Sequence, residues 1–326
     1  MGKCTDLNAR LNLISVCNGN VSFTSICLVL LICLNIYVQR HTAAKMIAAV
    51  WFVYKMFKLY SAESKALKTT APNPILRVNG KNQHLLTEEL RKTSPMVPTS
   101  TKKVMIESLD AVVNTPTLPT TNSKTCFVLT HPWGILGGDM DNNVPSEIAN
   151  ALTTFGYNTV RFNFRGVGRS SGCCTWRGHG ERNDLKTILT WILSNKGIPN
   201  IEHIVLVGYS YGSMISNSAA DLFPQIKAFV SIATPFTCYW GLSLFNCAYF
   251  NRSARTTTKP KLFMCGDADD FTGTKNYKKY TKCFDANKIV YLIDGVDHGW
   301  WGVESVAVAL ILRFIQEKLP EIGGGK

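Results

Sequence analysis

The sequence is poor in charged residues and lacks the cysteine spacing of a metal site. Only 17% of its 326 residues are charged, whereas 46% are hydrophobic. This balance excludes a mainly disordered chain, because such chains have too little apolar surface to bury. Eleven cysteines are present, yet no C-x-x-C occurs, which argues against a zinc site. We therefore expect free thiols in a reducing compartment, with no metal and no organic cofactor.

Charged residues are missing altogether between Arg10 and Arg40. Within this gap, residues 21–38 read VSFTSICLVLLICLNIYV and are just long enough to span a bilayer. A secretory signal peptide is the competing interpretation, but its apolar region should be shorter and lead into a small-residue cleavage site. The sequence therefore predicts a single membrane-spanning helix within an anchor region at residues 1–60.

Basic residues are concentrated in the N-terminal third. Residues 1–103 hold 14 basic and 4 acidic residues, a net +10, whereas residues 104–326 are close to balanced at +3. A nucleic-acid-binding domain would carry its basic residues on the folded part, so we expect no nucleic acid as partner. The basic residues that follow the apolar stretch place the C-terminal bulk in the cytosol by the positive-inside rule. Met1-Gly2-Lys3-Cys4 resembles an acylation start, although Asp6 departs from that pattern.

The chain changes character at about residue 104. Residues 61–103 are polar and contain four prolines, which predicts a linker. Over 104–326, short apolar runs alternate with longer amphipathic ones, which predicts a mostly parallel sheet with helices on both faces. We expect strands at 125–129, 159–164, 203–207, 228–232, 261–264 and 289–293, and helices at 146–155, 181–194, 211–222, 275–284 and 303–319.

The sharpest motif is Gly208-Tyr209-Ser210-Tyr211-Gly212, placed between a predicted strand and a predicted helix. G-x-S-x-G in this context is typical of a nucleophile elbow, in which a tight turn holds the serine at the end of the sheet. The glycines allow neighbouring backbone to pass close by, and the turn forces the serine into a strained conformation. Ser210 is therefore the candidate nucleophile.

A serine nucleophile needs a base and an acid that orients this base. In chains with this kind of elbow, the acid follows the serine in the sequence and the histidine comes last. His298 is the only one of six histidines after Ser210, and it follows the last predicted strand. Three aspartates compete for the acid after the preceding strand. Asp269 is favoured, Asp267 suits a turn-stabilising role, and Asp270 stays open.

A developing oxyanion needs donors that are already in place. One is expected to be the backbone N–H of Tyr211, directly after the nucleophile. The other should come from the loop Thr130-His131-Pro132-Trp133-Gly134, and because proline has no N–H we expect Trp133 to supply it. His131 is expected to have a structural role in this turn.

These motifs resemble the α/β-hydrolase superfamily, and its small bacterial-type serine hydrolases in particular. The resemblance is carried by the run from His131 to Met140, by Arg161-Phe-Asn-Phe-Arg-Gly-Val-Gly-Arg-Ser-Ser-Gly172, and by the run from Asp297 to Gly302. It covers roughly residues 104–319. Two departures are Trp133, where many relatives carry a second histidine, and the added N-terminal membrane segment. The resemblance implies an α/β-hydrolase fold and a serine hydrolase, and it leaves the substrate open.

The function expected from these residues is cleavage of a carboxylic ester or thioester, with a lipid-like acyl substrate in keeping with the membrane segment. A peptidase or acyltransferase would use the same three residues, and a non-catalytic, membrane-tethered binding module is the alternative from a different class. The aromatic-rich segment 237–256 is either a lid over the site or a packed excursion. The oligomeric state and the membrane that holds the anchor are not determined by the sequence.

Overall fold

The computed structural model describes residues 74–79, 96–175, 177–237, 247–285 and 287–322. The expected anchor at 1–60, with its span at 21–38, lies outside the described residues. Within the described ranges, no helix combines the length and the apolar character needed to cross a membrane.

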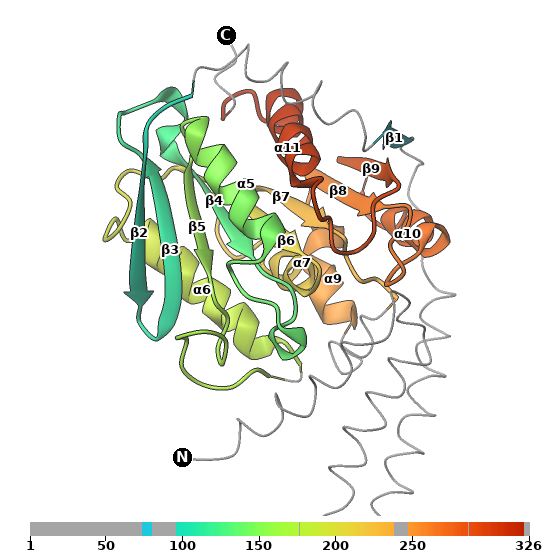
Figure 1. Cartoon of the computed structure of the whole chain (residues 1–326), viewed down its shortest axis with the longest axis horizontal. Coiled ribbons are helices and arrows are strands. Elements are labelled where there is room, and N and C mark those ends of the chain that lie inside the picture. Colours follow the sequence, from blue (N-terminus) through green and yellow to red (C-terminus); the bar gives the residue numbers. More distant parts are fainter. Residues whose placement is uncertain (1–73, 80–95, 176, 238–246, 286, 323–326) are drawn as a thin grey trace, which may run out of the picture. The chain divides into compact units, whose positions relative to one another are not determined.

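The described residues form one nine-stranded sheet in the order β1-β9-β8-β7-β6-β4-β5-β3-β2 (Figure 1). β3 runs antiparallel to both of its neighbours, and all other neighbouring strands are parallel. The strands are β1 (Ile75–Asn79), β2 (Thr99–Ile106), β3 (Leu109–Pro116), β4 (Thr125–Thr130), β5 (Asn158–Phe162), β6 (His203–Tyr209), β7 (Ile226–Ile232), β8 (Lys261–Gly266) and β9 (Lys288–Asp294).

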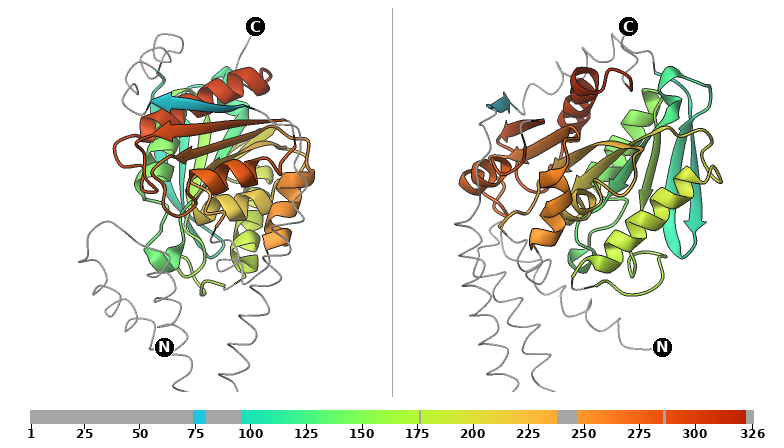
Figure 2. Two further views of the ribbon diagram at one scale, coloured as in Figure 1. Left: turned by 90° about the vertical axis from the view of Figure 1, so that its right-hand side faces the viewer. Right: turned by 180° about the vertical axis from the view of Figure 1, so that it is seen from behind.

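Helices cover both faces of the sheet (Figures 1 and 2). One face packs against α5 (Asn143–Thr154) and α11 (Glu304–Lys318), and their apolar side chains form one core cluster with the strands. The other face packs against α6 (His179–Leu193), α7 (Tyr211–Ser218), α9 (Cys247–Thr256) and α10 (Thr274–Thr281). Short 3₁₀ helices at Thr121–Lys124 and Gly134–Leu136 flank β4.

The six predicted strands and five predicted helices of residues 104–326 are confirmed within a few residues. The central strands are buried on both faces, so they read as continuous apolar runs, as expected for parallel strands between helical layers. Helix α7 is shorter than the pattern predicted: it ends at Ser218 because Ala219 leaves the helical conformation.

The segment expected to be a linker contributes to the sheet. β1 and most of β2 lie within 61–103, and β3 follows them, so the sheet begins well before residue 104. β1 and β2 escaped the sequence pattern because they are the two edge strands of the sheet. Seven of the eight residues of β2 are exposed or half-exposed, which leaves no buried alternation to detect.

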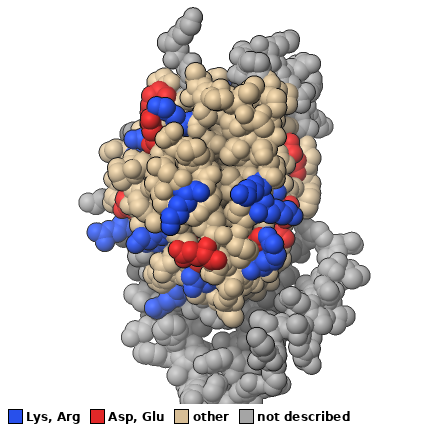
Figure 3. All heavy atoms as spheres, turned by 90° about the vertical axis from the view of Figure 1, so that its left-hand side faces the viewer, with Lys and Arg blue, Asp and Glu red and all other residues tan. Residues whose placement is uncertain are grey.

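On the face at the β2 edge, Lys and Arg side chains are interspersed with acidic and uncharged ones (Figure 3). Lys102 and Lys103 lie exposed on β2 itself. Charged side chains on an edge strand oppose pairing with another chain, because they would have to be brought close to its backbone.

The order of the strands reverses at β4, which has β5 on one side and β6 on the other. The loops after β4 and β6 therefore diverge at the carboxyl edge of the sheet. In open α/β sheets such a switch point forms the crevice in which ligands bind. Ser210 follows β6 directly, and residues 131–138 follow β4.

Candidate active site

Ser210 lies in a tight turn between β6 and α7, with φ 54° and ψ −121°. This conformation is strained for a residue with a side chain. The two motif glycines make the turn possible. A Cβ on Gly208 would lie 2.3 Å from the Cα of Ser213, and one on Gly212 would lie 2.4 Å from the carbonyl oxygen of Thr130. The steric reason for the G-x-S-x-G motif is thus confirmed atom by atom.

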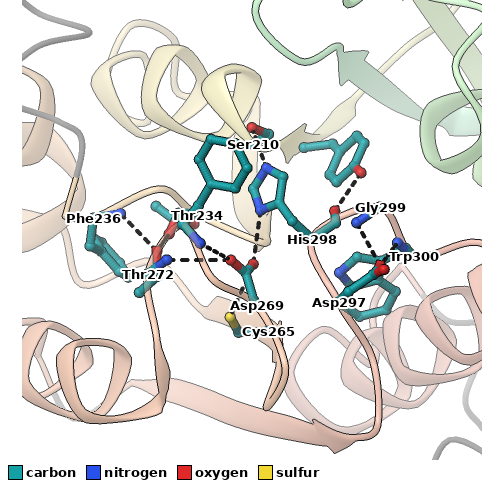
Figure 4. Close-up of polar contacts among 12 residues, drawn as sticks. Ser210, Thr234, Phe236, Cys265, Asp269, Thr272, Asp297, His298, Gly299 and Trp300 are labelled. Atoms are coloured by element: carbon teal, nitrogen blue, oxygen red, sulfur yellow. Dashed lines mark hydrogen bonds and ion pairs between the residues drawn. The ribbon is translucent and has the colours of Figure 1, made fainter. Parts of the chain in front are cut away.

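His298 lies in the loop between β9 and α11, where the sequence placed it. Its Nε2 is 2.9 Å from the Oγ of Ser210 (Figure 4). The ring packs against Phe271 with 4.2 Å between the ring centres, and the hydroxyl of Tyr209 donates to the carbonyl oxygen of His298 at 2.7 Å. Tyr209 therefore holds the backbone of His298, and Phe271 holds its ring, in the orientation that faces Ser210.

Asp269 completes the chain of contacts, since its Oδ2 is 2.9 Å from Nδ1 of His298. Its other oxygen, Oδ1, accepts the backbone N–H groups of Phe271 at 2.9 Å and Thr272 at 3.3 Å. These hydrogen bonds fix the rotation of the carboxyl group, which is fully buried. The structure thus brings together the three predicted residues from the loops after β6, β8 and β9.

Three neighbouring aspartates have other environments. Asp267 accepts the N–H of Gly295 at 2.8 Å, so its carboxylate joins the loop after β8 to the loop after β9, whereas the sequence predicted a role within its own turn. Asp270 is exposed. Asp297 accepts the N–H groups of Gly299 and Trp300, and so shapes the loop after His298.

The amide of Tyr211 is the first of α7, and the first amides of a helix have no partner within it. The amide of Trp133 opens the 3₁₀ helix Gly134–Leu136. The two loops touch, because Gly212 packs on the backbone of Thr130 and His131. Both expected oxyanion donors therefore come from segments that meet beside Ser210.

His131 is completely buried and sits at the start of this loop. Its Nε2 accepts the N–H of Phe164 at 3.0 Å, and its Nδ1 lies 2.6 Å from the carbonyl oxygen of Pro132. Burial lowers the pKa of His131 to about 4, so the ring is neutral at pH 7 and donates through Nδ1–H. Because that carbonyl shares its peptide group with the N–H of Trp133, the ring also fixes the direction of this N–H. The structural role predicted for His131 is confirmed.

Sequence reasoning missed several supporting residues. Asn163 accepts the N–H of Met140 at 2.9 Å and so holds the far end of the loop after β4. Asn143 on α5 donates to the carbonyl oxygen of Gly299 at 2.9 Å. The Cys265 thiol lies 3.5 Å from Oδ2 of Asp269, and burial together with this carboxylate raises the pKa of the thiol. Asn163 lies within the quoted R-F-N-F-R run, whereas no local pattern indicates the other two.

The expected lid segment is described only in part, because residues 238–246 lie outside the described ranges. Helix α9 packs against α7, with Phe250 and Ala254 buried in the core. The hydroxyl of Ser253 donates to Asp221 at 2.6 Å. This part of the segment is a covering helix of the fold.

No group of three or more potential metal ligands is found within the described ranges. The candidate site consists of a serine, a histidine and a carboxylate in a chain of hydrogen bonds, next to backbone donors. Such an arrangement can supply a nucleophile, a proton acceptor and oxyanion stabilisation.

Comparisons with known proteins agree with this architecture. A family model described as alpha/beta hydrolase fold matches residues 134–253. An uncharacterized protein from Rickettsia prowazekii is 34% identical over 114 residues, which are 35% of this chain and 46% of the relative. The chain thus spans about half the length of the curated relative that it matches.

Solved structures match over a longer part of the chain. An α/β serine hydrolase without lid from Xanthomonas campestris is 24% identical, with a TM-score of 0.55 over 70% of this chain and 99% of that chain. Est1E from Butyrivibrio proteoclasticus, solved with ferulic acid bound, is 16% identical, with a TM-score of 0.56 over 67% of this chain and 99% of that chain. Together with the strand order and the turn at Ser210, these likenesses show that the chain has the α/β-hydrolase fold.

Proposed function

We propose that this protein is a serine hydrolase that cleaves a carboxylic ester or thioester through an acyl-enzyme on Ser210. The observation that carries the proposal is the continuous chain from Ser210 Oγ to His298 to the buried Asp269, with both links at 2.9 Å. These distances lie within the range in which a base can take the proton of a nucleophile.

In the first half of the reaction, the Oγ of Ser210 attacks the substrate carbonyl carbon and its proton passes to Nε2 of His298. Asp269 accepts the Nδ1–H bond and stabilises the imidazolium that forms. The negative charge on the former carbonyl oxygen is stabilised by the N–H groups of Tyr211 and Trp133. When the C–O or C–S bond to the leaving group breaks, His298 returns its proton to the departing oxygen or sulfur.

In the second half, His298 takes a proton from a water molecule, and the resulting hydroxide attacks the acyl carbon. The bond to Ser210 Oγ breaks, and His298 protonates this oxygen. The products are the carboxylic acid and the restored serine. The description of one structural neighbour as a serine hydrolase supports this reaction class, and the ferulic acid bound in Est1E is itself a carboxylic acid.

The membrane location remains a proposal that rests on the sequence alone. We infer that residues 21–38 span a membrane once, that the hydrolase domain faces the cytosol, and that the net charge of +10 in residues 1–103 attracts an anionic leaflet. A lipid-like acyl substrate fits this location. Removing residues 1–60 should release the protein into the soluble fraction, and persistent membrane association would contradict the anchor.

The reaction class is tested by labelling the full chain with a fluorophosphonate, which reacts with activated serines. Wild type should be labelled, whereas Ser210→Ala and heat-denatured wild type should not. The control variant is Ser171→Ala, which removes an exposed serine and should be labelled like wild type. Equal labelling of Ser210→Ala, or no labelling of folded wild type, would contradict the proposal. Product analysis with competing alcohols then separates hydrolysis from acyl transfer.

A further inference from the structure

The edge strand β1 carries an arginine that connects the two loops of the histidine and the acid. β1 pairs in parallel with β9, with Arg77 opposite Leu292 and Asn79 opposite Asp294 (Figures 1 and 2). Ile75 and Val78 pack against the two core clusters, one on each face of the sheet. β1 is therefore held by apolar contacts as well as by its backbone pairing.

The guanidinium of Arg77 binds two carboxylates that lie far away in sequence. Its Nε and Nη2 donate to Oδ1 of Asp294 at 2.8 and 2.5 Å, and Nη2 also donates to Oδ2 of Asp267 at 2.8 Å. One nitrogen thus holds both carboxylates, which places their oxygens within about 5 Å of each other. The two carboxylates raise the pKa of Arg77, as expected for a cation between two anions.

Both carboxylates stand where an active-site loop begins. Asp267 directly follows β8 and precedes Asp269 by two residues, whereas Asp294 ends β9 and precedes His298 by four. Asp267 also accepts the N–H of Gly295, so the two loops are already joined once. Arg77 adds a second connection and compensates the charge of both carboxylates.

We propose that Arg77 is a positioning residue that sets the distance between the Asp269 loop and the His298 loop. This proposal rests on the hydrolase function proposed above. Without Arg77, two negative charges face each other at the ends of β8 and β9, and their repulsion pushes the two loops apart. The hydrogen bond between Asp269 and His298 then lengthens, and the orientation of the imidazole toward Ser210 is lost. The edge strand β1 thereby takes part in assembling the active site.

The test compares Arg77→Met, which keeps an unbranched apolar chain but removes the guanidinium, with Arg77→Lys, which keeps the positive charge but not the planar group with several N–H donors. The control is Lys124→Met, because Lys124 is about as exposed as Arg77 and forms an ion pair with Glu202 at the opposite ends of the strands. Steady-state hydrolysis of p-nitrophenyl butyrate by the full chain gives kcat and KM. Arg77→Met should lower kcat roughly three- to tenfold with KM within about twofold, Arg77→Lys should be intermediate, and Lys124→Met should match wild type.

A rescue separates positioning from general loss of structure. Adding Asp294→Asn to Arg77→Met removes the repulsion and should restore at least half of the lost kcat. If Arg77→Met does not fold, the salt dependence of wild type decides: 1 M NaCl should lower its kcat more than that of Arg77→Lys/Asp294→Asn. An active wild type with unchanged kcat in Arg77→Met, no rescue, or no salt effect would overturn the positioning role. An inactive, unlabelled wild type would instead contradict the hydrolase function itself.

Discussion

Acid should destabilise this protein in a pH range set by the buried ring of His131. The pKa of His131 is about 4 in the folded protein and 6.5 as a free side chain. In this range the unfolded state binds a proton at this ring and the folded state does not. The free energy of unfolding therefore keeps its full value above pH 6.5 and decreases as the pH falls from 6.5 toward 4. The difference between the two pKa values corresponds to about 3 kcal/mol of unfolding free energy, at 1.36 kcal/mol per pKa unit.

Between pH 7.5 and 5.0 the loss from His131 amounts to about 2 kcal/mol. For a domain of this size, this lowers the melting temperature by about 4–8 °C. The buried carboxyl of Asp110 keeps its charge in this window. The arginine partner of Asp110 lowers the pKa of that carboxyl below 3.8, so it stays ionised. His203 contributes in the same direction, because burial also lowers its pKa, although it is only partly buried.

The assay is thermal unfolding of the full chain in detergent at the two pH values, followed by circular dichroism. His131→Gln should be less stable than wild type at pH 7.5, and its melting temperature should fall by about 4–8 °C less between pH 7.5 and 5.0. His203→Gln serves as the control and should keep most of the wild-type acid sensitivity. A direct reading comes from ¹³C-labelled histidine rings by NMR. If His131 titrates near 6.5, or if His131→Gln keeps the full acid sensitivity, the reasoning is refuted.

Two substitutions in the active site have outcomes that the contacts specify. In Asp269→Asn, the side-chain oxygen must keep accepting the amides of Phe271 and Thr272, so the NH₂ group faces His298 and selects the wrong tautomer of its ring. The kcat should fall about 10³- to 10⁴-fold with an unchanged melting temperature, and a loss below tenfold would contradict this role. In Gly138→Ala, the added Cβ would lie 2.4 Å from the carbonyl oxygen of Pro132, so the peptide group that carries the Trp133 N–H must move. The kcat for p-nitrophenyl butyrate should fall at least tenfold, and an unchanged kcat would exclude Trp133 as an oxyanion donor.

The central sheet and the three facing residues were predictable because their signals are local. The central strands are buried and mostly apolar, and the elbow is a five-residue motif whose glycines have a steric reason. The place of His298 followed from its being the sole histidine after Ser210. Among the aspartates, Asp267 and Asp269 differ by only two positions, and the structure separates them through the amides that each one accepts.

The contacts that support the site could not be predicted in this way. Arg77 is separated from Asp267 by 190 residues and from Asp294 by 217, and no periodicity or motif records such a pairing. Its strand is short and half-exposed, and prolines nearby indicated a linker. The same exposure that hides β1 from sequence patterns also leaves Arg77 at the surface, where its fork can reach both carboxylates. A segment that looks like a tether can therefore hold the loops that bear the proposed acid and base, and truncations meant to free the domain should keep residues from 74 onward.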